Sequence, residues 1–499
     1  MLSAVARLPQ VTRLVSHKNY FVVHAPRQVG KTTALLGLAE QLTNSGEYTA
    51  ILLSVEVGAP FSQDVAMAEE AILGAWENTI EIRLPIELQA PAWTSTRPGQ
   101  KIRAALQQWA RVSPRPLVIF IDEIDALQDM ALVSILRQLR DGYQNRPHAF
   151  PQSVGLIGLR DVRDYKTFGG GSDKLNTASP FNIKVESLTM RNFYAEEVAE
   201  LYQQHTADTG QIFTPEATEL AFELTQGQPW LVNALARQLV EVVAPELTTV
   251  ITPLMVDEAK EILIRRQDTH LDSLAERLRE NRVKIIMEPI LAGQELPNTA
   301  DEDRQYLVDL GLLKRDPAGG LIVANPIYRE VLPRVLAQGS QDSLPTIAPT
   351  WLTAAGEIDL DILLHSVLDF WLQHGEALLK SASYPEVAPH LVLMAFLHRV
   401  INGGGTLERE YAIGRDRMDL CLRYGEVTLG IELKVWRTGR SNPLTLGLVQ
   451  LEEYLDRLQQ PRGWLMIFDK RQSALALADR LKTEEVKTAS GHNVIVIWA

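Results

Sequence analysis

Residues 20–42 constrain the fold more than any other segment, because they read as an apolar strand, a short loop and a helix in direct succession. The strand is YFVVH, and the loop ends in Gly30-Lys31-Thr32, where helical periodicity begins. Backbone N–H groups of such a loop, together with the helix N-terminus, form a site for phosphate. The pattern Gly-x-x-x-x-Gly-Lys-Ser/Thr is complete except for Ala25 at the first glycine, and a methyl group is the smallest departure from glycine. We therefore expect a phosphate-binding loop here.

The loop residues are the candidate nucleotide ligands. Lys31 would reach the β- and γ-phosphates, and Thr32 would bind Mg²⁺. Arg27 is interpreted first as a loop residue and second as a ligand. The complete set is Ala25, Pro26, Arg27, Gln28, Val29, Gly30, Lys31, Thr32 and Thr33.

A second segment, LVIFIDEIDAL (117–127), is an apolar strand that ends in two carboxylates. Asp122 would organise the Mg²⁺ shell, and Glu123 would polarise the attacking water as a general base. Together with the phosphate-binding loop, this strand predicts a site for ATP and Mg²⁺.

Short β-branched runs alternate with amphipathic helices from residue 19 to about 160, which predicts an α/β fold with a parallel sheet covered on both faces. The expected strands are Tyr20–His24, Ala50–Val55, Leu117–Ile121 and Val154–Leu159. The expected helices are Lys31–Leu42, Val65–Trp76, Lys101–Val112 and Ala131–Tyr143.

The rest of the chain reads as further domains. Helices are expected at Asn192–His205, Thr214–Leu224 and Trp230–Val242. Residues 281–335 read as helix, helix and short β-ribbon, which suits a winged helix, and residues 336–358 are rich in Gly, Ser, Pro and Thr, as a linker is. The predicted domains are a P-loop ATPase core (1–190), a helical subdomain (191–280), the winged helix (281–335), the linker (336–358) and a C-terminal α/β domain (359–499).

Composition limits the setting in which the chain acts. Its 499 residues contain no run of about 18 apolar residues and no signal-peptide pattern, so we expect a soluble, cytoplasmic protein without a membrane partner. The single Cys421 excludes an internal disulfide and a cysteine-built zinc site, and it is expected to be a buried thiol. A net charge of -13 argues against indiscriminate binding to nucleic acid, so any such contact must use a local basic face.

The chain resembles the AAA-like ATPases of the archaeal-ATPase and STAND groupings over about residues 10–335. The shared segments are Ala25–Thr33, Ile121–Asp125, Gly158–Lys166, Ser179–Ile183 and Gly227–Leu235. The resemblance implies nucleotide-dependent domain movement and, at Arg160, a γ-phosphate sensor or a trans-acting arginine. A surface ion pair of Arg160 with Asp161 or Asp164 is the alternative. The turn before Pro229 is interpreted as a helix start, and a homo-oligomer formed through the ATPase domain is a further expectation.

The segment GRDRMDLCLRYGEVTLGIELKVWR (414–437) reads as two β-strands joined by a tight turn at Gly425. Period-two alternation puts Glu432 and Lys434 on one face of the second strand, while its apolar residues face the other way. Charged side chains on an otherwise buried strand are costly unless they have partners, and Asp419 on the first strand is the obvious partner.

Asp419 followed by Glu432-Leu433-Lys434 has the spacing of the PD-(D/E)XK nuclease core, which residues 360–499 resemble. The resemblance implies a restriction-endonuclease-like α/β domain with an α-β-β-β-α-β order, in which one strand is weakly marked. Asp419 and Glu432 would bind Mg²⁺ or Mn²⁺, and Lys434 would stabilise charge or position the water.

Two more features extend this resemblance. Glu386 precedes an apolar helix, where the fold places an additional acidic metal ligand, although a helix first-turn charge is the alternative. Gln450 and Tyr454 lie at i and i+4 of the helix after the Glu-x-Lys strand, where the family often carries a Gln-x-x-x-Tyr pair. His390 and His398 are interpreted as packing residues.

The leading hypothesis is an ATP-dependent or ATP-regulated, metal-dependent endo- or exodeoxyribonuclease, and the resemblance suggests a role in defence against foreign DNA or in mobile-element biology. Two alternatives stay open: a STAND-like ATP switch whose inactive nuclease-like domain binds a partner, and a winged-helix DNA-binding regulator. DNA, the expected nucleic-acid partner, would contact a basic patch around the hairpin, for which a solvated charged face is the alternative reading. The patch comprises Arg415, Arg417, Arg423, Lys434, Arg437 and Arg440.

Overall fold

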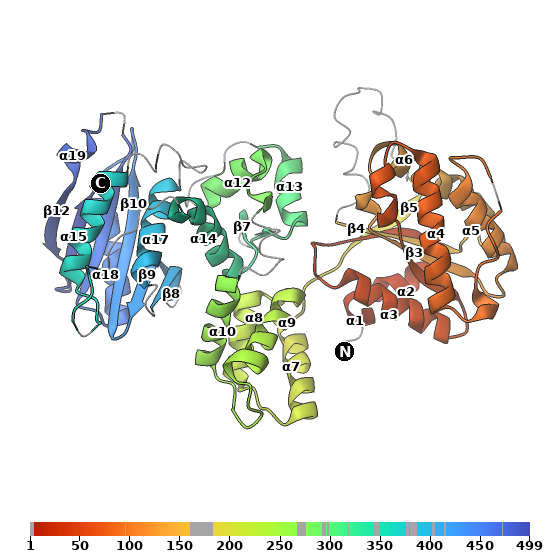
Figure 1. The fold of residues 1–499 in the computed structure, drawn as a ribbon, viewed down its shortest axis with the longest axis horizontal. Coiled ribbons are helices and arrows are strands. Elements are labelled where there is room, and N and C mark those ends of the chain that lie inside the picture. Colours follow the sequence, from red (N-terminus) through yellow and green to blue (C-terminus); the bar gives the residue numbers. More distant parts are fainter. Residues whose placement is uncertain are drawn as a thin grey trace. The chain divides into compact units, whose positions relative to one another are not determined.

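The computed structural model describes residues 4–94, 96–159, 183–266, 276–291, 296, 299–317, 319–342, 350–354, 356–375, 379, 387–401, 405–413, 416–471 and 473–499. The chain divides into two compact units. Figure 1 shows the ribbon with its helices and strands labelled. The first unit comprises Met1–Leu263 and Gln305–Leu321, and the second comprises Ile264–Arg304 and Ile322–Ala499.

A parallel sheet forms the centre of the first unit, and its described strands have the order β2-β3-β4-β1-β5. The four strands expected from the sequence are confirmed, with ends that differ by one residue at most. The sequence does not predict β5, because this edge strand, KVESLT, lacks a continuous apolar run. The strands are β1 (Tyr20–His24), β2 (Thr49–Ser54), β3 (Leu117–Asp122), β4 (Ser153–Gly158) and β5 (Lys184–Thr189).

Helices cover both faces of this sheet, as expected for α/β proteins. Alternate residues of β1 point into two separate cores: Phe21 packs with α2 and α3, whereas Val22 packs with α4, α5 and α6. The four expected helices are confirmed, and α4 continues past Trp76 because Ile80 extends its buried face. The helices are α2 (Pro9–Ser16), α3 (Lys31–Asn44), α4 (Val65–Arg83), α5 (Lys101–Val112) and α6 (Asp129–Gly142).

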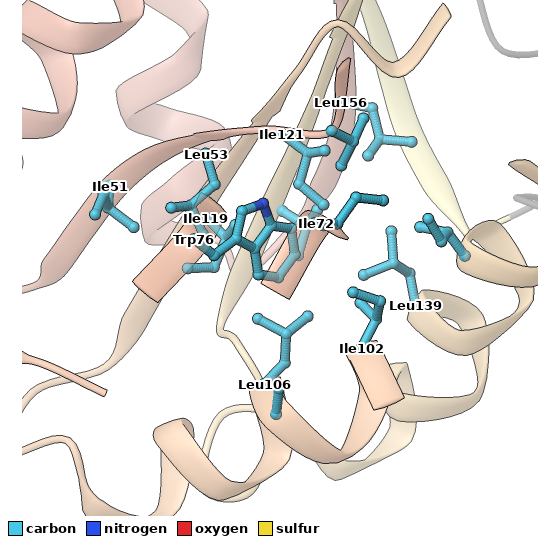
Figure 2. Close-up of a cluster of buried hydrophobic side chains, with 14 of the residues drawn as sticks. Ile51, Leu53, Ile72, Trp76, Ile102, Leu106, Ile119, Ile121, Leu139 and Leu156 are labelled. Atoms are coloured by element: carbon cyan, nitrogen blue, oxygen red, sulfur yellow. The ribbon is translucent and has the colours of Figure 1, made fainter. Parts of the chain in front are cut away.

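The core beneath α4, α5 and α6 surrounds the indole ring of Trp76. Figure 2 shows this ring among Leu53 of β2, Ile119 of β3 and Ile72 of α4. The indole N–H donates a hydrogen bond to the carbonyl oxygen of Ser54 at 2.8 Å, so the ring is buried without leaving its polar atom unpaired. This packing fixes β2 and β3 and therefore the strand end that carries Asp122.

The chain after β5 is helical, which confirms the three helices expected there. These are α7 (Ala195–Thr209), α8 (Pro215–Thr225) and α9 (Pro229–Gln238), and α10 (Pro253–Arg266) follows. The described elements after α10 then have the order helix, helix, strand, strand, helix. They are α12 (Asn281–Leu291), α13 (Asp301–Asp309), β6 (Leu313–Arg315), β7 (Leu321–Val323) and α14 (Pro326–Asp342).

One difference from the sequence prediction concerns the linker. α14 ends at Asp342, so residues 336–342 of the expected linker are helical. The Gly and Ser residues of this stretch lower helix propensity without breaking a helix that has already begun. The winged helix and the remaining domain boundaries stay predictions.

The second unit contains a sheet whose described strands have the order β12-β13-β11-β10-β9-β8. β8, β9 and β10 form an antiparallel meander, and α18 (Leu444–Leu458) connects β10 to its parallel neighbour β11. The expected turn is confirmed, because Tyr424 pairs with Val427 around Gly425, whose φ is 54°. The strands are β8 (Thr406–Ile413), β9 (Asp416–Tyr424), β10 (Val427–Trp436), β11 (Arg462–Asp469), β12 (Lys482–Lys487) and β13 (Asn493–Trp498).

Different helices cover the two faces of this sheet. α18 packs Leu451 and Leu455 against Leu465, on the face that also carries the buried thiol of Cys421. On the other face, the rings of Trp371 and of His390 in α17 (Ala388–Val400) lie 5.1 Å and 6.0 Å from the ring of Phe468. His390 is therefore a packing residue, as the sequence indicates. Over the described ranges of the chain, no helix has the length and apolar character needed to cross a membrane.

Candidate functional site

The phosphate-binding loop connects β1 to α3, and two of its residues have left-handed backbones. Gln28 has a φ of 60° and Gly30 a φ of 82°, whereas Ala25 is not among the residues with positive φ. A side chain is therefore compatible with the backbone at Ala25, which explains why alanine can replace the first glycine of the motif. The methyl group of Ala25 is buried in the core beside β1.

Lys31 begins α3, and its side chain lies along the loop. Its Nζ atom donates hydrogen bonds to the carbonyl oxygens of Ala25 at 2.7 Å and Pro26 at 2.8 Å. Burial lowers the pKa of Lys31, while nearby carboxylates, of which Asp125 has the largest effect, oppose this change. The ammonium group thus lies at the loop where the sequence predicts its contact with phosphate.

Thr32 and Asp122 meet at the carboxyl ends of the strands, because β1 and β3 both neighbour β4 in the sheet. The hydroxyl group of Thr32 donates a hydrogen bond to Oδ2 of Asp122 at 2.7 Å, and Oδ1 accepts the backbone N–H of Glu123 at 3.0 Å. A hydroxyl and a carboxylate are oxygen ligands of the kind that Mg²⁺ prefers. These residues therefore fit the magnesium ion that the sequence predicts.

Glu123 follows Asp122 with a φ of 57°, an uncommon backbone for a residue other than glycine. Burial raises the pKa of Glu123, and the neighbouring carboxylates of Asp125 and Asp122 raise it further. A carboxylate with a raised pKa is a stronger base, which suits the general-base role that the sequence predicts.

The remaining loop candidates differ in exposure. Arg27, Gln28 and Thr33 are exposed, whereas Val29 is buried. An exposed Arg27 agrees with its interpretation as a loop residue first. Arg160 lies outside the described residues, so its role stays a prediction.

Two residues that contact the loop from outside are missing from the sequence-based site. Arg7 donates a hydrogen bond to the carbonyl oxygen of Val29 at 2.9 Å, and Gln228 Nε2 approaches the carbonyl oxygen of Gln28 at 3.5 Å. Gln228 is also the N-cap of α9, where it accepts the N–H of Leu231 at 2.6 Å, so the predicted helix start is confirmed. No local sequence pattern predicts these contacts, since each joins residues far apart in the sequence.

The second candidate site lies on the β9–β10 hairpin. One step beyond the Leu420–Ile431 pair, Asp419 stands opposite Glu432, and its Oδ2 atom accepts the backbone N–H of Leu433 at 2.8 Å. Lys434 donates a hydrogen bond to Oε1 of Glu432. The structure thus brings together the three residues that the sequence selects.

The carboxyl group of Glu432 lies in a buried environment. It is 2% exposed, and burial, followed by the effect of Asp419, raises its pKa to about 8 although Lys434 opposes the change. Its Oε2 atom is buried and makes no hydrogen bond within the described residues. A buried carboxylate oxygen without a donor is costly, so this position calls for a cation or another partner.

α18 covers the face of the sheet that carries Glu432 and Lys434. Gly447 of this helix lies beside the Lys434 side chain, because a Cβ at Gly447 would be 3.4 Å from Cγ of Lys434. Gln450, one turn further on, has a buried Oε1 atom that accepts no hydrogen bond within the described residues. Tyr454 is buried in the core beneath the helix, which favours a packing role for its ring.

Other parts of this predicted site cannot be placed in the same way. Glu386 and Arg415 lie outside the described residues, as does the side chain of Arg417. Arg440 is exposed and Arg437 is half-buried, so part of the predicted basic patch reaches the surface. Within the described part of the chain, no three His, Cys, Asp or Glu side chains gather as a metal site. Mg²⁺ commonly takes one or two carboxylates and keeps several waters, so the pair of Asp419 and Glu432 still fits this ion.

Comparisons with known proteins find similarity among solved structures. No protein-family model and no curated protein matches the sequence. Among solved structures, the chain is similar to the Walker-type ATPase PABY2304 of Pyrococcus abyssi, with 14% identity, a TM-score of 0.45, and coverage of 66% of this chain and 96% of that one.

Two further solved structures are similar at a lower level. RuvB of Thermotoga maritima, a Holliday junction branch migration motor, has 16% identity and a TM-score of 0.35, covering 64% of this chain and 89% of that one. Cdc6p from Pyrobaculum aerophilum has 13% identity and a TM-score of 0.35, covering 67% and 94%. In the first unit, the parallel sheet, the loop after β1 and the hydrogen bond between Thr32 and Asp122 have the arrangement that the sequence predicts for nucleotide binding.

Proposed function

We propose that this chain is an ATP-hydrolysing, metal-dependent DNA nuclease in which the P-loop ATPase domain controls cleavage by the C-terminal unit. The observation that carries the proposal is the pairing of two chemically suited sites on one chain. Thr32 and Asp122 meet in the first unit, and Asp419, Glu432 and Lys434 meet in the second.

The proposed ATPase chemistry follows from the geometry of the loop. Backbone N–H groups and Lys31 would bind the phosphates, and Thr32 with Asp122 would hold Mg²⁺, which would supply positive charge beside the phosphates. Glu123, next to Asp122 and with a raised pKa, would accept the proton of the attacking water.

The proposed nuclease chemistry follows from the hairpin. Asp419 and Glu432 would hold Mg²⁺ or Mn²⁺, which supplies a water of lowered pKa and stabilises charge on a scissile phosphate when it is bound. The Oε2 atom of Glu432 has no hydrogen-bond partner among the described residues, and this supports the assignment because a cation would offset the cost of burying that oxygen. Lys434 would place its ammonium group beside the negative charge that develops on phosphate.

The order of elements around the hairpin gives further support. α17, β8, β9, β10, α18 and β11 follow one another in the α-β-β-β-α-β order that the sequence predicts for a PD-(D/E)XK nuclease, with β8 as the weakly marked strand. The amide oxygen of Gln450, on the helix over this face, accepts no hydrogen bond from the described part of the chain, so it could contact a water or the substrate. Glu386 stays a proposed additional ligand.

DNA is the proposed substrate because basic residues border the hairpin of an otherwise acidic chain. Arg437 and Arg440 follow β10 directly, so they lie at the strand end nearest Lys434. Assembly of the ATPase domains into a homo-oligomer and a role in defence or mobile-element biology are proposed as the setting of this activity.

The direct test is an assay of purified protein with plasmid, linear duplex DNA, single-stranded DNA and RNA. With Mg²⁺, we expect cleavage of at least one DNA substrate, and we expect chelation by EDTA to abolish it. An Asp419→Ala variant that still cleaves would trace the activity to a contaminant. The absence of cleavage of every substrate, with and without ATP, would remove the nuclease proposal and leave an ATPase.

A further inference from the structure

Arg7 reaches the phosphate-binding loop from the N-terminal helix α1 (Ala4–Arg7). Its guanidinium group is buried, with 8% of the residue exposed, and donates one hydrogen bond to the carbonyl oxygen of Val29 at 2.9 Å and another to that of Arg191. One side chain thus joins the loop to the segment that follows β5.

The Val29 contact determines which way a peptide plane of the loop faces. In a trans peptide the carbonyl and the N–H point in opposite directions, so a donor on the Val29 oxygen directs the N–H of Gly30 away from Arg7. Gln28 and Gly30, on either side of Val29, have left-handed φ values of 60° and 82°. Successive N–H groups in such a turn form the concave site that binds an anion.

The guanidinium group also packs closely against the end of the loop. A Cβ added to Gly30 would lie 3.6 Å from Nη1 of Arg7, which is van der Waals contact. The group therefore supports the peptide that precedes Lys31 both by hydrogen bonding and by packing.

The other end of the guanidinium contacts a well-anchored segment. Arg7 lies 4.7 Å from the ring centroid of Phe193, and the backbone N–H of Phe193 donates to the carbonyl oxygen of Gly227 at 2.8 Å. Arg191 makes two hydrogen bonds to Glu197 of α7, at 2.5 Å and 2.8 Å. Residues 191–193 are thereby tied to α7 and to the turn before α9.

Holding Arg7 in this position has a cost. Burial, followed by repulsion from Arg191, lowers the pKa of Arg7 to about 10, and its Nε atom makes no hydrogen bond within the described residues. Among the described side chains, none forms an ion pair with Arg7 itself. Burying a cation in this way opposes folding, and such costs are concentrated at functional sites.

We propose that Arg7 is a positioning residue for nucleotide binding. Through Val29 it directs the loop N–H groups at phosphate, and through residues 191–193 it makes phosphate affinity depend on the segment that leads to α7. This role rests on the proposed nucleotide binding at the loop. Its ligand class is the diphosphate group common to ADP, ATP and inorganic pyrophosphate.

The test compares the full-length wild type with Arg7→Ala and Arg7→Lys. Binding of a fluorescent ADP analogue, displaced by pyrophosphate, gives phosphate affinity, and ATP turnover gives KM and kcat separately. We expect Arg7→Ala to weaken both ligands about tenfold and to raise KM, with kcat within about twofold, because a hydrogen bond from a charged donor is lost outside the reacting atoms. Arg7→Lys, which keeps one donor, should recover part of the affinity.

Arg13→Ala is the matched control, because Arg13 is exposed and pairs with Glu186 on the surface. It should bind like the wild type. Equal affinity of Arg7→Ala and the wild type would overturn the proposal, as would a fall in kcat with unchanged KM. If Arg7→Ala is poorly folded by circular dichroism, Arg7→Lys alone decides: wild-type affinity overturns the proposal, and a higher KM at unchanged kcat and thermal midpoint supports it. A wild type that binds no nucleotide would instead refute the proposed ATPase function.

Discussion

At the scale of single residues, the proposed nucleotide site assigns ATP binding and ATP hydrolysis to different side chains. Lys31 lies along the loop carbonyls, whereas Glu123 lies after β3 with a pKa raised by burial. Lys31→Ala should abolish ATP binding because it removes the cation at the phosphates, and Glu123→Gln should bind ATP but lose hydrolysis by about a hundredfold or more. ATP affinity by calorimetry and phosphate release check both. Full turnover by Lys31→Ala would show that the loop is not the nucleotide site.

Glu432 gives a prediction about pH. Its pKa is raised from 4.5 to about 8, so between these values the folded protein holds a proton that the unfolded chain has released. The contribution of this carboxyl group to the free energy of unfolding is therefore fully present below about pH 4.5 and is lost as pH rises through 8. In EDTA, the thermal midpoint of Glu432→Gln should exceed that of the wild type at pH 8 and approach it at pH 5.

Glu426→Gln is the control for this pH effect, because Glu426 is exposed in the turn of the same hairpin. It should follow the wild type at both pH values. Identical pH profiles of Glu432→Gln and the wild type would mean that Glu432 is ionised in the folded protein without cost.

At the scale of elements, one buried carboxylate joins three helices of the first unit. Glu69 of α4 accepts the N–H groups of Gly99 at 2.7 Å and Lys101 at 3.2 Å, at the start of α5, and the amide of Gln138 in α6 at 2.7 Å. Glu69→Ala should destabilise folding by about 2–4 kcal/mol, since it leaves buried donors unpaired. Chemical denaturation measures this change.

Glu70→Ala provides the matched comparison, because Glu70 is the next residue, its side chain is exposed, and it forms an ion pair with Lys101 at 2.5 Å. Its loss should cost less than about 1 kcal/mol. If the two variants lose equal stability, the three hydrogen bonds of Glu69 do not hold the helices together.

The elements with a strong periodic signal are the ones that the sequence predicts. β1 and β3 are continuous apolar runs, and β10 alternates around Glu432, so all three were recognisable. β5 and β12 are polar edge strands, whose identity depends on a neighbouring strand that lies far away in the sequence.

The same limit applies to the two sites. Thr32, Asp122, Asp419 and Glu432 belong to motifs whose spacing carries information, whereas Arg7 contacts the loop across 22 residues without any motif. For Tyr454 the motif is present, but the motif does not show where the side chain lies. The spacing selects Tyr454 as a site residue, whereas the structure buries its ring in the core. Spacing identifies a residue, but only packing shows which way its side chain faces.

At the scale of the whole molecule, the proposed sites lie in separate compact units. Asp419→Ala and Lys434→Ala should therefore eliminate DNA cleavage while ATP turnover stays within about twofold of the wild type, since neither change touches a loop residue. Steady-state ATPase and cleavage assays on the same preparations check this. Loss of both activities together would indicate misfolding or one shared site.

Control of one unit by the other requires that ATP bind one arrangement of the chain more tightly than another. A tenfold effect on cleavage needs a difference of only about 1.4 kcal/mol in that preference. This free-energy difference is small compared with the binding free energy of a typical nucleotide site. ATP binding could therefore supply enough free energy to change the cleavage rate tenfold.

The decisive measurement is the DNA cleavage rate of wild type and Lys31→Ala at saturating Mg²⁺, each with ATP, with ADP and without nucleotide. We expect the wild-type rate to change about tenfold between nucleotide conditions, and the Lys31→Ala rate to be the same in all three, because the variant cannot sense the ligand. Identical rates in all six reactions would contradict control by the ATPase domain and would leave two independent enzymes on one chain.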